Sequence, residues 1–255
     1  MPKPMEFQGL TTLVTGASRG IGAQTALAMA SRGAFTLIHY AKNKDGAALV
    51  LKKIREGGGE GALVEGDLST SPGIHEFLNL VHEIGRPIDI LVNNAGSLVK
   101  RSCFLEIDEA LWNRVITLNL TSAFLVAQAV LPGMLERHRG FIVNISSVAA
   151  RFGGGIGAIA YSSAKAALSA LTKGMAREFA PHGIRINAVA PGSVDTDYHR
   201  AFSTPSMLRA TVAATPMGRL GTPPEIAEVV VFLCSEAGNF IQGQTIEVNG
   251  GFLMV

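Results

Sequence analysis

The stretch "TGASRGIG" at residues 15–22 lies between the apolar run "LTTLVT" at 10–15 and the helix-forming segment "AQTALAMASRG". A glycine loop in this position suits a phosphate: Gly16 permits a tight turn, Gly20 lets the backbone approach a pyrophosphate, and Gly22 lets the helix pack closely on the strand. The spacing differs from GxGxxG, so the location between a first strand and a first helix is what favours a dinucleotide site.

Short apolar runs rich in Val, Ile and Leu recur along the chain between longer helix-like segments. Continuous apolar runs are typical of strands covered on both faces, and parallel strands need connections of helix length. The sequence therefore predicts an α/β fold, a single-domain Rossmann-type doubly wound seven-stranded parallel sheet with helices on both faces. The predicted strands are "LTTLVT" at 10–15, "FTLIHY" at 35–40, "GALVEG" at 61–66, "IDILVN" at 88–93, "FIVNIS" at 141–146, "IRINAVA" at 184–190 and "QTIEVN" at 244–249.

Residues 1–255 are predicted to form one domain, because no Pro/Ser-rich linker or block of charge divides them. The longest segment without a clear strand is 191–222, and it follows the end of a predicted strand. We interpret this segment as a candidate substrate lid.

Composition argues against several classes of partner. A formal net charge of +2 and an aromatic content of 6% leave no basic stripe and few stacking platforms, so no nucleic acid is expected. Cys103 and Cys234 have no zinc-ligand spacing and the six histidines form no cluster, so a reducing compartment and no metal are expected. The N-terminal "MPKPMEFQG" lacks an apolar signal segment, and polar residues interrupt the most apolar stretch, which predicts a cytoplasmic protein outside the membrane.

Tyr161 and Lys165, in "AYSSAKAALSALTKGMA", are four residues apart and share one face of a helix. Taken alone, such a pair is more often an exposed aromatic beside a solvated lysine. An ammonium close to a phenol, however, favours the phenolate and lowers the phenol pKa from its usual value near 10. We therefore interpret Tyr161 as a general acid for ketone reduction and a base for alcohol oxidation, with Lys165 lowering its pKa.

Several motifs together resemble the short-chain dehydrogenase/reductase family, and in particular its 3-oxoacyl-carrier-protein reductase-like branch. The resemblance runs from about residue 8 to residue 251. It implies a nicotinamide dinucleotide lying across the strand ends. The motifs are, in order, "TGASRGIG", "NNAG" at 93–96, "YSSAK" at 161–165, "APG" at 190–192 and "VNGG" at 248–251.

The resemblance also implies which residues hold the cofactor. Asp67 would contact the adenosine, although Asp67 also suits the N-cap of a helix that begins in "LSTSPG" directly after it, and Lys165 would hold the nicotinamide ribose. Asn94 and Gly96 would line the adenine-ribose side. The predicted cofactor-binding residues are Gly16, Ser18, Arg19, Gly20, Ile21, Gly22, Tyr40, Lys42, Asp67, Leu68, Asn94, Gly96, Tyr161 and Lys165, with Pro191, Gly192, Val194 and Thr196 at the nicotinamide end.

The end of the second predicted strand bears on which dinucleotide binds. A site that prefers NAD usually has a carboxylate there, which accepts from the ribose 2′-hydroxyl and repels a 2′-phosphate. The residue here is Tyr40, and Arg19 and Lys42 can donate to a phosphate. NADP(H) is therefore favoured over NAD(H), although Lys42 and Lys44 also suit an ordinary solvated loop.

Two further residues complete the predicted catalytic set. Strand alternation lets only one of Ser146 and Ser147 face the cleft, and the resemblance selects Ser147 to polarise the substrate carbonyl. Asn119, in "TLNLTSAF", matches the family asparagine that holds a water linked to the lysine, although a buried asparagine needs partners in any case. The loop from Ser147 to Tyr161 is one residue longer than in many family members, which leaves the shape of the pocket open.

The sequence thus predicts an NADP(H)-dependent ketoreductase that transfers hydride between nicotinamide and a carbonyl or secondary alcohol. The alternatives are an NAD(H)-linked alcohol, polyol or steroid dehydrogenase and a catalytically silent nucleotide-binding regulatory protein, which would have lost Tyr161 or Lys165. A carrier-linked substrate would need basic residues near the cleft, for which helix ends offer Arg137, His138, Arg139 and His182. Apolar helix faces around 108–137 and 160–180 predict a homotetramer, or a dimer with the same contacts.

Overall fold

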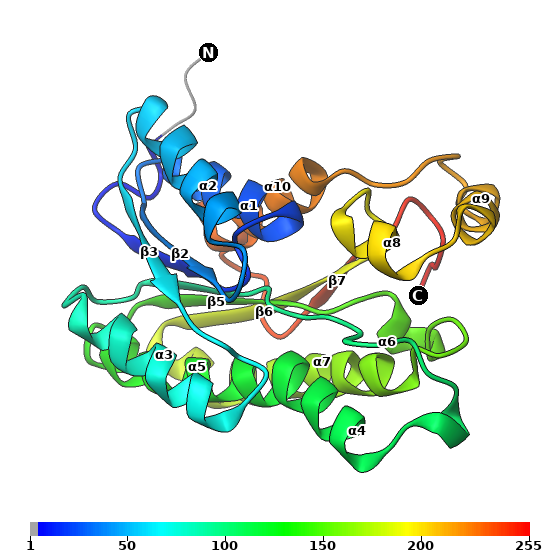
Figure 1. Ribbon diagram of the computed structural model, residues 1–255. Coiled ribbons are helices and arrows are strands. Elements are labelled where there is room, and N and C mark those ends of the chain that lie inside the picture. Colours follow the sequence, from blue (N-terminus) through cyan, green and yellow to red (C-terminus); the bar gives the residue numbers. More distant parts are fainter. Residues whose placement is uncertain (1–4) are drawn as a thin grey trace.

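The computed structural model describes residues 5–255, so the first four residues of the stretch used to argue against a signal peptide lie outside it. One parallel sheet runs through the molecule in the order β3-β2-β1-β4-β5-β6-β7 (Figure 1). Each predicted strand is confirmed to within about two residues at either end. The strands are β1 (Thr11–Val14), β2 (Phe35–Tyr40), β3 (Gly61–Glu65), β4 (Ile90–Asn93), β5 (Gly140–Ile145), β6 (Ile184–Pro191) and β7 (Thr245–Val248).

Helices cover both faces of the sheet, as predicted (Figure 1). α1, α2 and α10 lie on one face, whereas α3, α4, α5 and α7 lie on the other. The helices are α1 (Gly20–Ala30), α2 (Lys44–Glu56), α3 (Ser71–Glu83), η1 (Phe104–Glu106), α4 (Glu109–Ile116), the π-helical turn η2 (Thr117–Thr121), α5 (Ser122–Glu136), α6 (Ala149–Phe152), α7 (Ile159–Phe179), η3 (Ala180–His182), α8 (Asp197–Phe202), α9 (Pro205–Ala214), α10 (Pro223–Cys234) and η4 (Glu236–Gly238).

The continuous apolar runs of the strands are explained by two separate cores. Val14 of β1 packs with Met29 of α1 and Val230 of α10, while its neighbour Leu13 packs on the opposite side with Phe77 of α3. Both strand residues are fully buried. Successive side chains point to opposite faces of a strand, so a strand that is covered on both faces must be apolar at every position.

The strand order places the ligand crevice. β1 pairs with β2 on one side and with β4 on the other, so the chain changes direction across the sheet between β1 and β4. In open α/β sheets ligands bind outside the carboxyl ends of the strands at such a point. The glycine loop and the "NNAG" segment follow β1 and β4 and therefore meet there.

The candidate lid, 191–222, contains two helices that the sequence reading did not predict. α8 and α9 occupy half of it, and the segment returns to its base where Gly221 forms a bridge with Val194. The backbone N–H of Asp195 donates to Gly221 O at 2.9 Å, and that of Gly221 donates to Ser193 O at 2.9 Å. The segment thus leaves the end of β6 and returns to the same place, and its role as a substrate lid stays a prediction.

One helical stretch within residues 5–255, Glu109–Glu136, is long and apolar enough to span a membrane by length and composition alone. The most apolar part of this stretch is 44% buried inside the molecule. Helix α5, which belongs to the stretch, contacts both the sheet and α3. Core helices of globular domains have the same properties.

Candidate active site

The glycine loop has the backbone that its sequence predicts. Gly16 and Gly20 adopt φ values of +65° and +58°, which side chains with a Cβ rarely adopt. A Cβ on Gly22 would lie 2.4 Å from Gly16 O, so close packing also requires glycine there. The side chain of Asn94 fixes the loop by donating to Thr15 O at 2.8 Å and Gly16 O at 3.0 Å.

The first turn of α1 differs from the starts of neighbouring helices. α2 and α3 are capped by their own side chains, since Asn43 accepts from Gly46 N and Thr70 accepts from Gly73 N. α1 begins after Arg19 with no side-chain cap and no acidic residue in its first turn. Its N–H groups and the positive end of the helix dipole therefore suit an anion, as a pyrophosphate-binding helix requires.

A buried histidine supports the loop from below. His39, the penultimate residue of β2, accepts from Gly16 N through Nδ1 at 2.8 Å, so its Nε2–H donates to Gly66 O at 3.0 Å. Burial lowers the pKa of His39 to about 4, although the hydrogen bond to Gly66 and the charge of Asp67 oppose that shift. The ring is therefore neutral and holds one tautomer.

Asn119, Lys165 and Gly96 meet beyond the end of β4. Asn119 is buried in the π-helical turn, donates to Ser97 O and Val115 O at 2.8 Å each, and accepts from Ser97 N at 3.1 Å. A Cβ on Gly96 would lie 2.7 Å from Asn119 Oδ1 and 3.0 Å from Lys165 Nζ. Glycine at position 96 thus lets the backbone approach both side chains.

Ser147, Tyr161 and Lys165 form a cluster at the end of β5. Ser147 acts on the phenol of Tyr161 and opposes the rise of its pKa, and Lys165 Nζ lies 5.7 Å from the centroid of the Tyr161 ring. Lys165 is buried and donates to Ile145 O at 2.7 Å. Ser146 points away from this cluster, because its buried hydroxyl bonds to Lys165 O and Ser169 Oγ.

The pKa of Tyr161 departs from the sequence-based expectation. Burial raises the pKa of Tyr161 to about 12, and the hydrogen bond from Ser147 only partly opposes this. Burial also lowers the pKa of Lys165 to about 7, so its charge is incomplete at neutral pH. Burial therefore dominates the pKa of the phenol in this structure, and the lowering of that pKa by Lys165 stays a prediction.

The residues assigned to the adenosine end are close together but have partners of their own. Tyr40 is buried and donates to Glu65 Oε2 at 3.0 Å, which brings a carboxylate of β3 next to the strand end where an acid is missing. Arg19 is 66% exposed and lies 3.8 Å from Asp197 of α8. Lys42 is exposed, and its charge helps to lower the pKa of Asp67.

Asp67 does not cap a helix. Its Oδ1 accepts from Ser69 N at 2.9 Å. The side chain of Ser69 is the main cause of the lowered pKa of Asp67, and this backbone hydrogen bond adds to it. The cap of α3 is Thr70, so the N-cap interpretation of Asp67 is wrong, because the helix begins later than expected. Leu68 is buried in the core below.

The residues assigned to the nicotinamide end form the exit from β6. Pro191 ends the strand, and a Cβ on Gly192 would lie 2.8 Å from Asn249 Cα. Val194 is buried in the bridge to Gly221. Thr196 Cγ2 lies 3.4 Å from the position of a Cβ on Gly20, so the base of the lid adjoins the glycine loop.

A family model described as Enoyl-(Acyl carrier protein) reductase matches residues 16–253. The chain belongs to the short-chain dehydrogenase/reductase family. Within this family it is an oxidoreductase of the branch that contains the 3-oxoacyl-carrier-protein reductases, as the resemblance predicted.

Relatives of this short-chain dehydrogenase/reductase differ in the substrate that their names give and in the cofactor that their structures contain. The 3-oxoacyl-[acyl-carrier-protein] reductase FabG of Vibrio harveyi is 40% identical over 98% of this chain and 100% of its own. A 3-oxoacyl-[acyl-carrier protein] reductase from Brucella melitensis with bound NAD has a TM-score of 0.90 at 34% identity, covering 100% and 95% of the two chains. A protein from Beutenbergia cavernae, proposed to be an NAD(P)-dependent gluconate 5-dehydrogenase and holding NADP at low occupancy, has a TM-score of 0.90 at 34% identity, covering 98% and 99%.

The basic residues suggested for carrier docking lie far from this site. Arg137, His138 and Arg139 directly precede β5, and His182 directly precedes β6. They therefore lie at the amino ends of the strands, opposite the catalytic cluster. Arg137 also pairs with Asp89 at 3.3 Å, so these residues do not provide the basic surface near the cleft that carrier docking would need.

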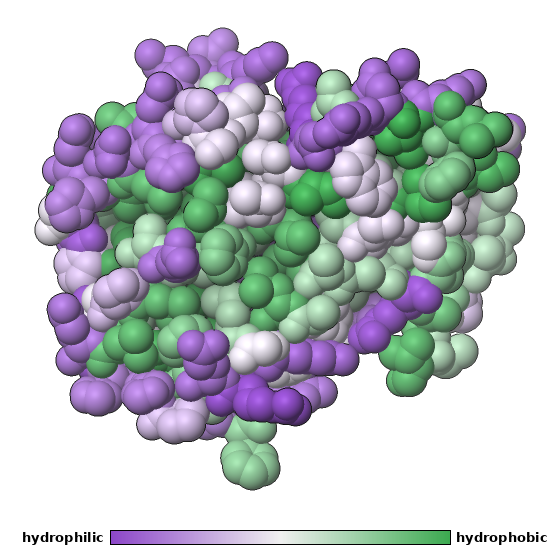
Figure 2. Space-filling model, turned by 90° about the horizontal axis from the view of Figure 1, so that it is seen from below, coloured by the Kyte–Doolittle hydropathy of each residue, from purple (hydrophilic) through white to green (hydrophobic). Residues whose placement is uncertain are grey.

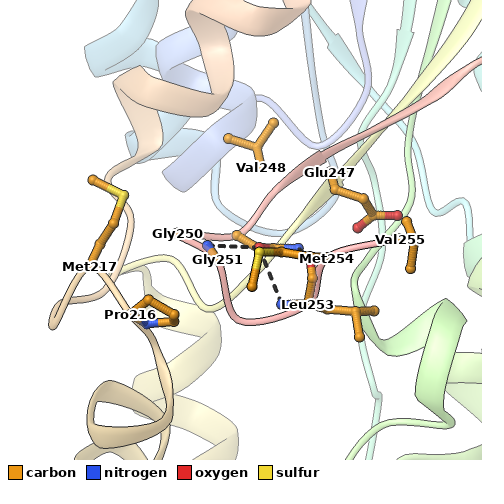
Figure 3. Close-up of a pocket in the computed structure, with 10 residues that line it drawn as sticks. Pro216, Met217, Glu247, Val248, Gly250, Gly251, Leu253, Met254 and Val255 are labelled. Atoms are coloured by element: carbon orange, nitrogen blue, oxygen red, sulfur yellow. Dashed lines mark hydrogen bonds between the residues drawn. The ribbon is translucent and has the colours of Figure 1, made fainter.

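A separate hollow of about 690 Å³ lies beside the end of β7 (Figure 3). Pro216 and Met217 form one wall and the C-terminal residues form the other. Asn249 stabilises the turn that follows β7, because its Oδ1 accepts from Gly251 N at 3.1 Å and from Leu253 N at 3.4 Å. Ser147, Tyr161 and Lys165 do not line this hollow, so it is not the catalytic cleft of the short-chain dehydrogenase/reductase.

Sequence reasoning missed His39, Glu65, Arg101 and Tyr198. Tyr198 of α8 reaches the catalytic cluster, with its ring centroid 6.0 Å from that of Tyr161. A polar residue inside the apolar run of β2 was the available signal for His39. No local pattern marks the other three, because tertiary packing alone brings them to the site.

Proposed function

We propose that this short-chain dehydrogenase/reductase transfers hydride between NADP(H) and a carbonyl or secondary alcohol, with Tyr161 as general acid and base. The observation that carries this proposal is the convergence of Ser147, Tyr161 and the buried Lys165 at the end of β5, with Lys165 Nζ 5.7 Å from the centroid of the Tyr161 ring. The cluster adjoins an uncapped helix start and a glycine loop.

Each residue has a separate task in this proposal. The phenol of Tyr161 is protonated at neutral pH because its pKa is about 12, so it can donate to a carbonyl oxygen during reduction. Ser147 orients that oxygen through its hydroxyl. Lys165 and Asn119, which converge on Gly96, supply the route by which a proton returns.

The dinucleotide supplies the hydride when it is bound. The glycine loop and the start of α1 would hold its pyrophosphate, and Asp67, Asn94 and Gly96 would line the adenosine side. The residues from Pro191 to Thr196 would hold the nicotinamide end. Glycines at the points of closest approach and the free N–H groups of α1 fit such a ligand.

A preference for NADP(H) is supported by Tyr40 at the end of β2 and by the cations Arg19 and Lys42. Glu65, which accepts from Tyr40, weakens this preference because its carboxylate would repel a 2′-phosphate nearby. The relatives that hold NAD or NADP fit either choice. An NAD(H)-linked dehydrogenase is therefore the second candidate.

Assembly into a homotetramer is supported by an apolar face on α4, α5 and α7 (Figure 2). Trp112 and Phe124 are 39% and 43% exposed on this side of the molecule. A second copy of the chain would cover such a surface, since monomers rarely expose large apolar patches. Light scattering at micromolar concentration tests this, and a monomer alone would contradict it. The cytoplasmic location and the absence of a membrane partner stay predictions.

The test of function is the oxidation of NADPH by the purified chain with a panel of ketones, quinones and acyl thioesters. We expect turnover with at least one carbonyl class, and loss of that turnover in Lys165→Ala together with weaker NADPH binding. Binding of NADPH without turnover of any substrate in either direction would instead support the regulatory alternative.

A further inference from the structure

Three segments that enclose the substrate side of the site converge on Arg101. Its Nε donates to Phe202 O of α8 at 3.1 Å, and its Nη1 donates to Ile156 O at 2.5 Å. The next residue, Ser102, donates its backbone N–H to Gly157 O at 3.2 Å. Arg101 therefore lies where the lid meets the loop between Ser147 and Tyr161.

The backbone around Arg101 is shaped to admit its side chain. A Cβ on Gly157 would lie 2.6 Å from Arg101 Cγ, so only glycine leaves room for the arginine stem. Two residues before Arg101, Val99 has φ +62°, a conformation that is unfavourable for a β-branched residue. Unfavourable backbone of this kind persists where the surrounding structure fixes it, often at binding sites.

The charge of Arg101 has no acidic partner within residues 5–255. The acids of the lid, Asp195 and Asp197, pair instead with Arg200 at 3.6 Å and 2.6 Å. Two backbone carbonyls occupy two of the five N–H donors of a guanidinium, so three donors and the net charge remain.

Two aromatic residues connect Arg101 with the proposed proton donor. The Tyr198 ring lies 6.0 Å from the Tyr161 ring and 5.1 Å from the Phe202 ring, and Arg101 bonds to the carbonyl of Phe202. The charge of Arg101 acts on both Tyr198 and His199. The rings of Tyr198 and Phe202 therefore link Tyr161 to the segment that Arg101 contacts.

We propose that Arg101 binds the carboxylate of the substrate, so that the enzyme acts on an oxo acid or hydroxy acid in which the carboxylate and the reacting carbon belong to one small molecule. This inference rests on the proposed function and names its substrate class. A carboxylate matches the flat fork of a guanidinium. A 3-oxoacyl thioester carries no free carboxylate, so a carrier-linked substrate would not make this contact.

The experiment compares kcat/KM for 2-, 3- and 5-oxo acids with that for their methyl esters, using NADPH. In the wild type we expect the best acid to exceed its ester by at least about tenfold, the effect of one desolvated ion contact. Arg101→Gln should lower kcat/KM for that acid at least about tenfold, mainly through KM, and leave the ester within about threefold. Arg101→Lys should fall between the two.

The matched control is Lys100→Gln, which removes one exposed charge from the same segment. This variant should leave kcat/KM unchanged for both the acid and the ester. Equal losses for acid and ester in Arg101→Gln would overturn the proposal, because Arg101 would then only join the two loops. A wild type that prefers the esters throughout would overturn it as well. If instead the proposed function is wrong, neither the acids nor the esters support NADPH oxidation by the wild type, which distinguishes this outcome from the two above.

A second measurement covers the case in which Arg101→Gln does not fold. Butanoate and butanamide have similar shapes, and neither carries a carbonyl that the enzyme can reduce to a secondary alcohol. We expect butanoate to inhibit the wild type competitively with a ketone substrate and butanamide to inhibit at least about tenfold less. Equal inhibition by the two would overturn the proposal.

Discussion

The cofactor side and the substrate side of the cleft are built in different ways. The cofactor side consists of the backbone of the glycine loop and the start of α1, fixed by hydrogen bonds from Asn94 and His39. The substrate side consists of irregular segments and the short helix α8, which meet at the side chain of Arg101. Backbone groups can serve any dinucleotide, whereas side chains on loops can be exchanged to suit another substrate.

This difference explains why relatives of similar fold carry different substrate names. A glycine loop that is fixed by strands tolerates little change, because a Cβ on Gly16 would lie 3.0 Å from Ala95 Cα. The walls around Arg101 contain exposed residues such as Ile156, which is 87% exposed, so a different side chain there would disturb little packing. Family membership therefore identifies the reaction class of this chain more firmly than its substrate.

The largest expected effect is on turnover, and it leaves cofactor binding on the other side of the cleft unchanged. Tyr161→Phe removes the proton donor and keeps the ring, so kcat should fall by about 10²- to 10⁴-fold while NADPH binding is retained. Steady-state assays of NADPH oxidation measure kcat, and fluorescence titration measures the affinity for NADPH. Near-normal turnover in a folded variant would falsify the assignment of Tyr161.

The second prediction is that lowering the pH destabilises the cofactor side through His39. The folded pKa of His39 is about 4 and its usual value is 6.5, so the unfolded chain binds a proton more readily between these values. His39 therefore stabilises the fold by about 3 kcal/mol above pH 6.5, and this contribution is lost as the pH falls towards 4. Urea unfolding from pH 7 to pH 4 should show a steeper loss for the wild type than for His39→Asn. Parallel curves would contradict this.

A smaller effect is expected where the two sides meet. Gly96→Ala would place a Cβ 2.7 Å from Asn119 Oδ1 and 3.0 Å from Lys165 Nζ, at a cost of about 1–3 kcal/mol in the free energy of unfolding. Gly174→Ala in α7 is the matched control, since its Cβ would meet nothing within 4 Å. The control should stabilise the chain by about 0.5–1 kcal/mol. Urea unfolding compares them, and equal effects would show that Gly96 is not tightly packed.

The smallest effect concerns the choice of dinucleotide and sharpens the description of the cofactor side. NADPH should bind at least about tenfold tighter than NADH, or about 1.4 kcal/mol, and the difference should narrow as salt rises. Tyr40→Asp should lower the preference, and Glu65→Gln should raise it, because the first adds a carboxylate and the second removes one. Titration of both cofactors at low and high ionic strength measures this. Equal affinities in the wild type would favour the NAD(H)-linked alternative.

The parts of the molecule that follow local rules could be predicted from sequence. The strands were predictable because each is apolar over its whole length, and the glycine loop because its glycines sit between a strand and a helix. The closeness of Tyr161 and Lys165 followed from the spacing of four residues along α7. These features depend on short windows of sequence and little else.

The remaining features depend on packing between distant segments. The raised pKa of Tyr161 comes from burial, which no window around residue 161 reveals. The sequence predicted that Arg19 donates to a phosphate of the cofactor. In the structure its guanidinium lies 3.8 Å from the carboxylate of Asp197, because α8 folds back towards the glycine loop. The position of Arg101 likewise depends on the lid.

The burial of Lys165 has a consequence for the proton balance of folding. Its pKa falls from 10.5 to about 7 on folding, so between these pH values the unfolded chain carries a proton that the folded chain does not. Folding in mildly alkaline solution therefore releases protons, and this residue favours the folded form increasingly as the pH rises from 7 to 10.5. A refolding mixture with little buffer becomes more acidic as the chain folds, and the measured heat of folding depends on the ionisation enthalpy of the buffer that takes up those protons.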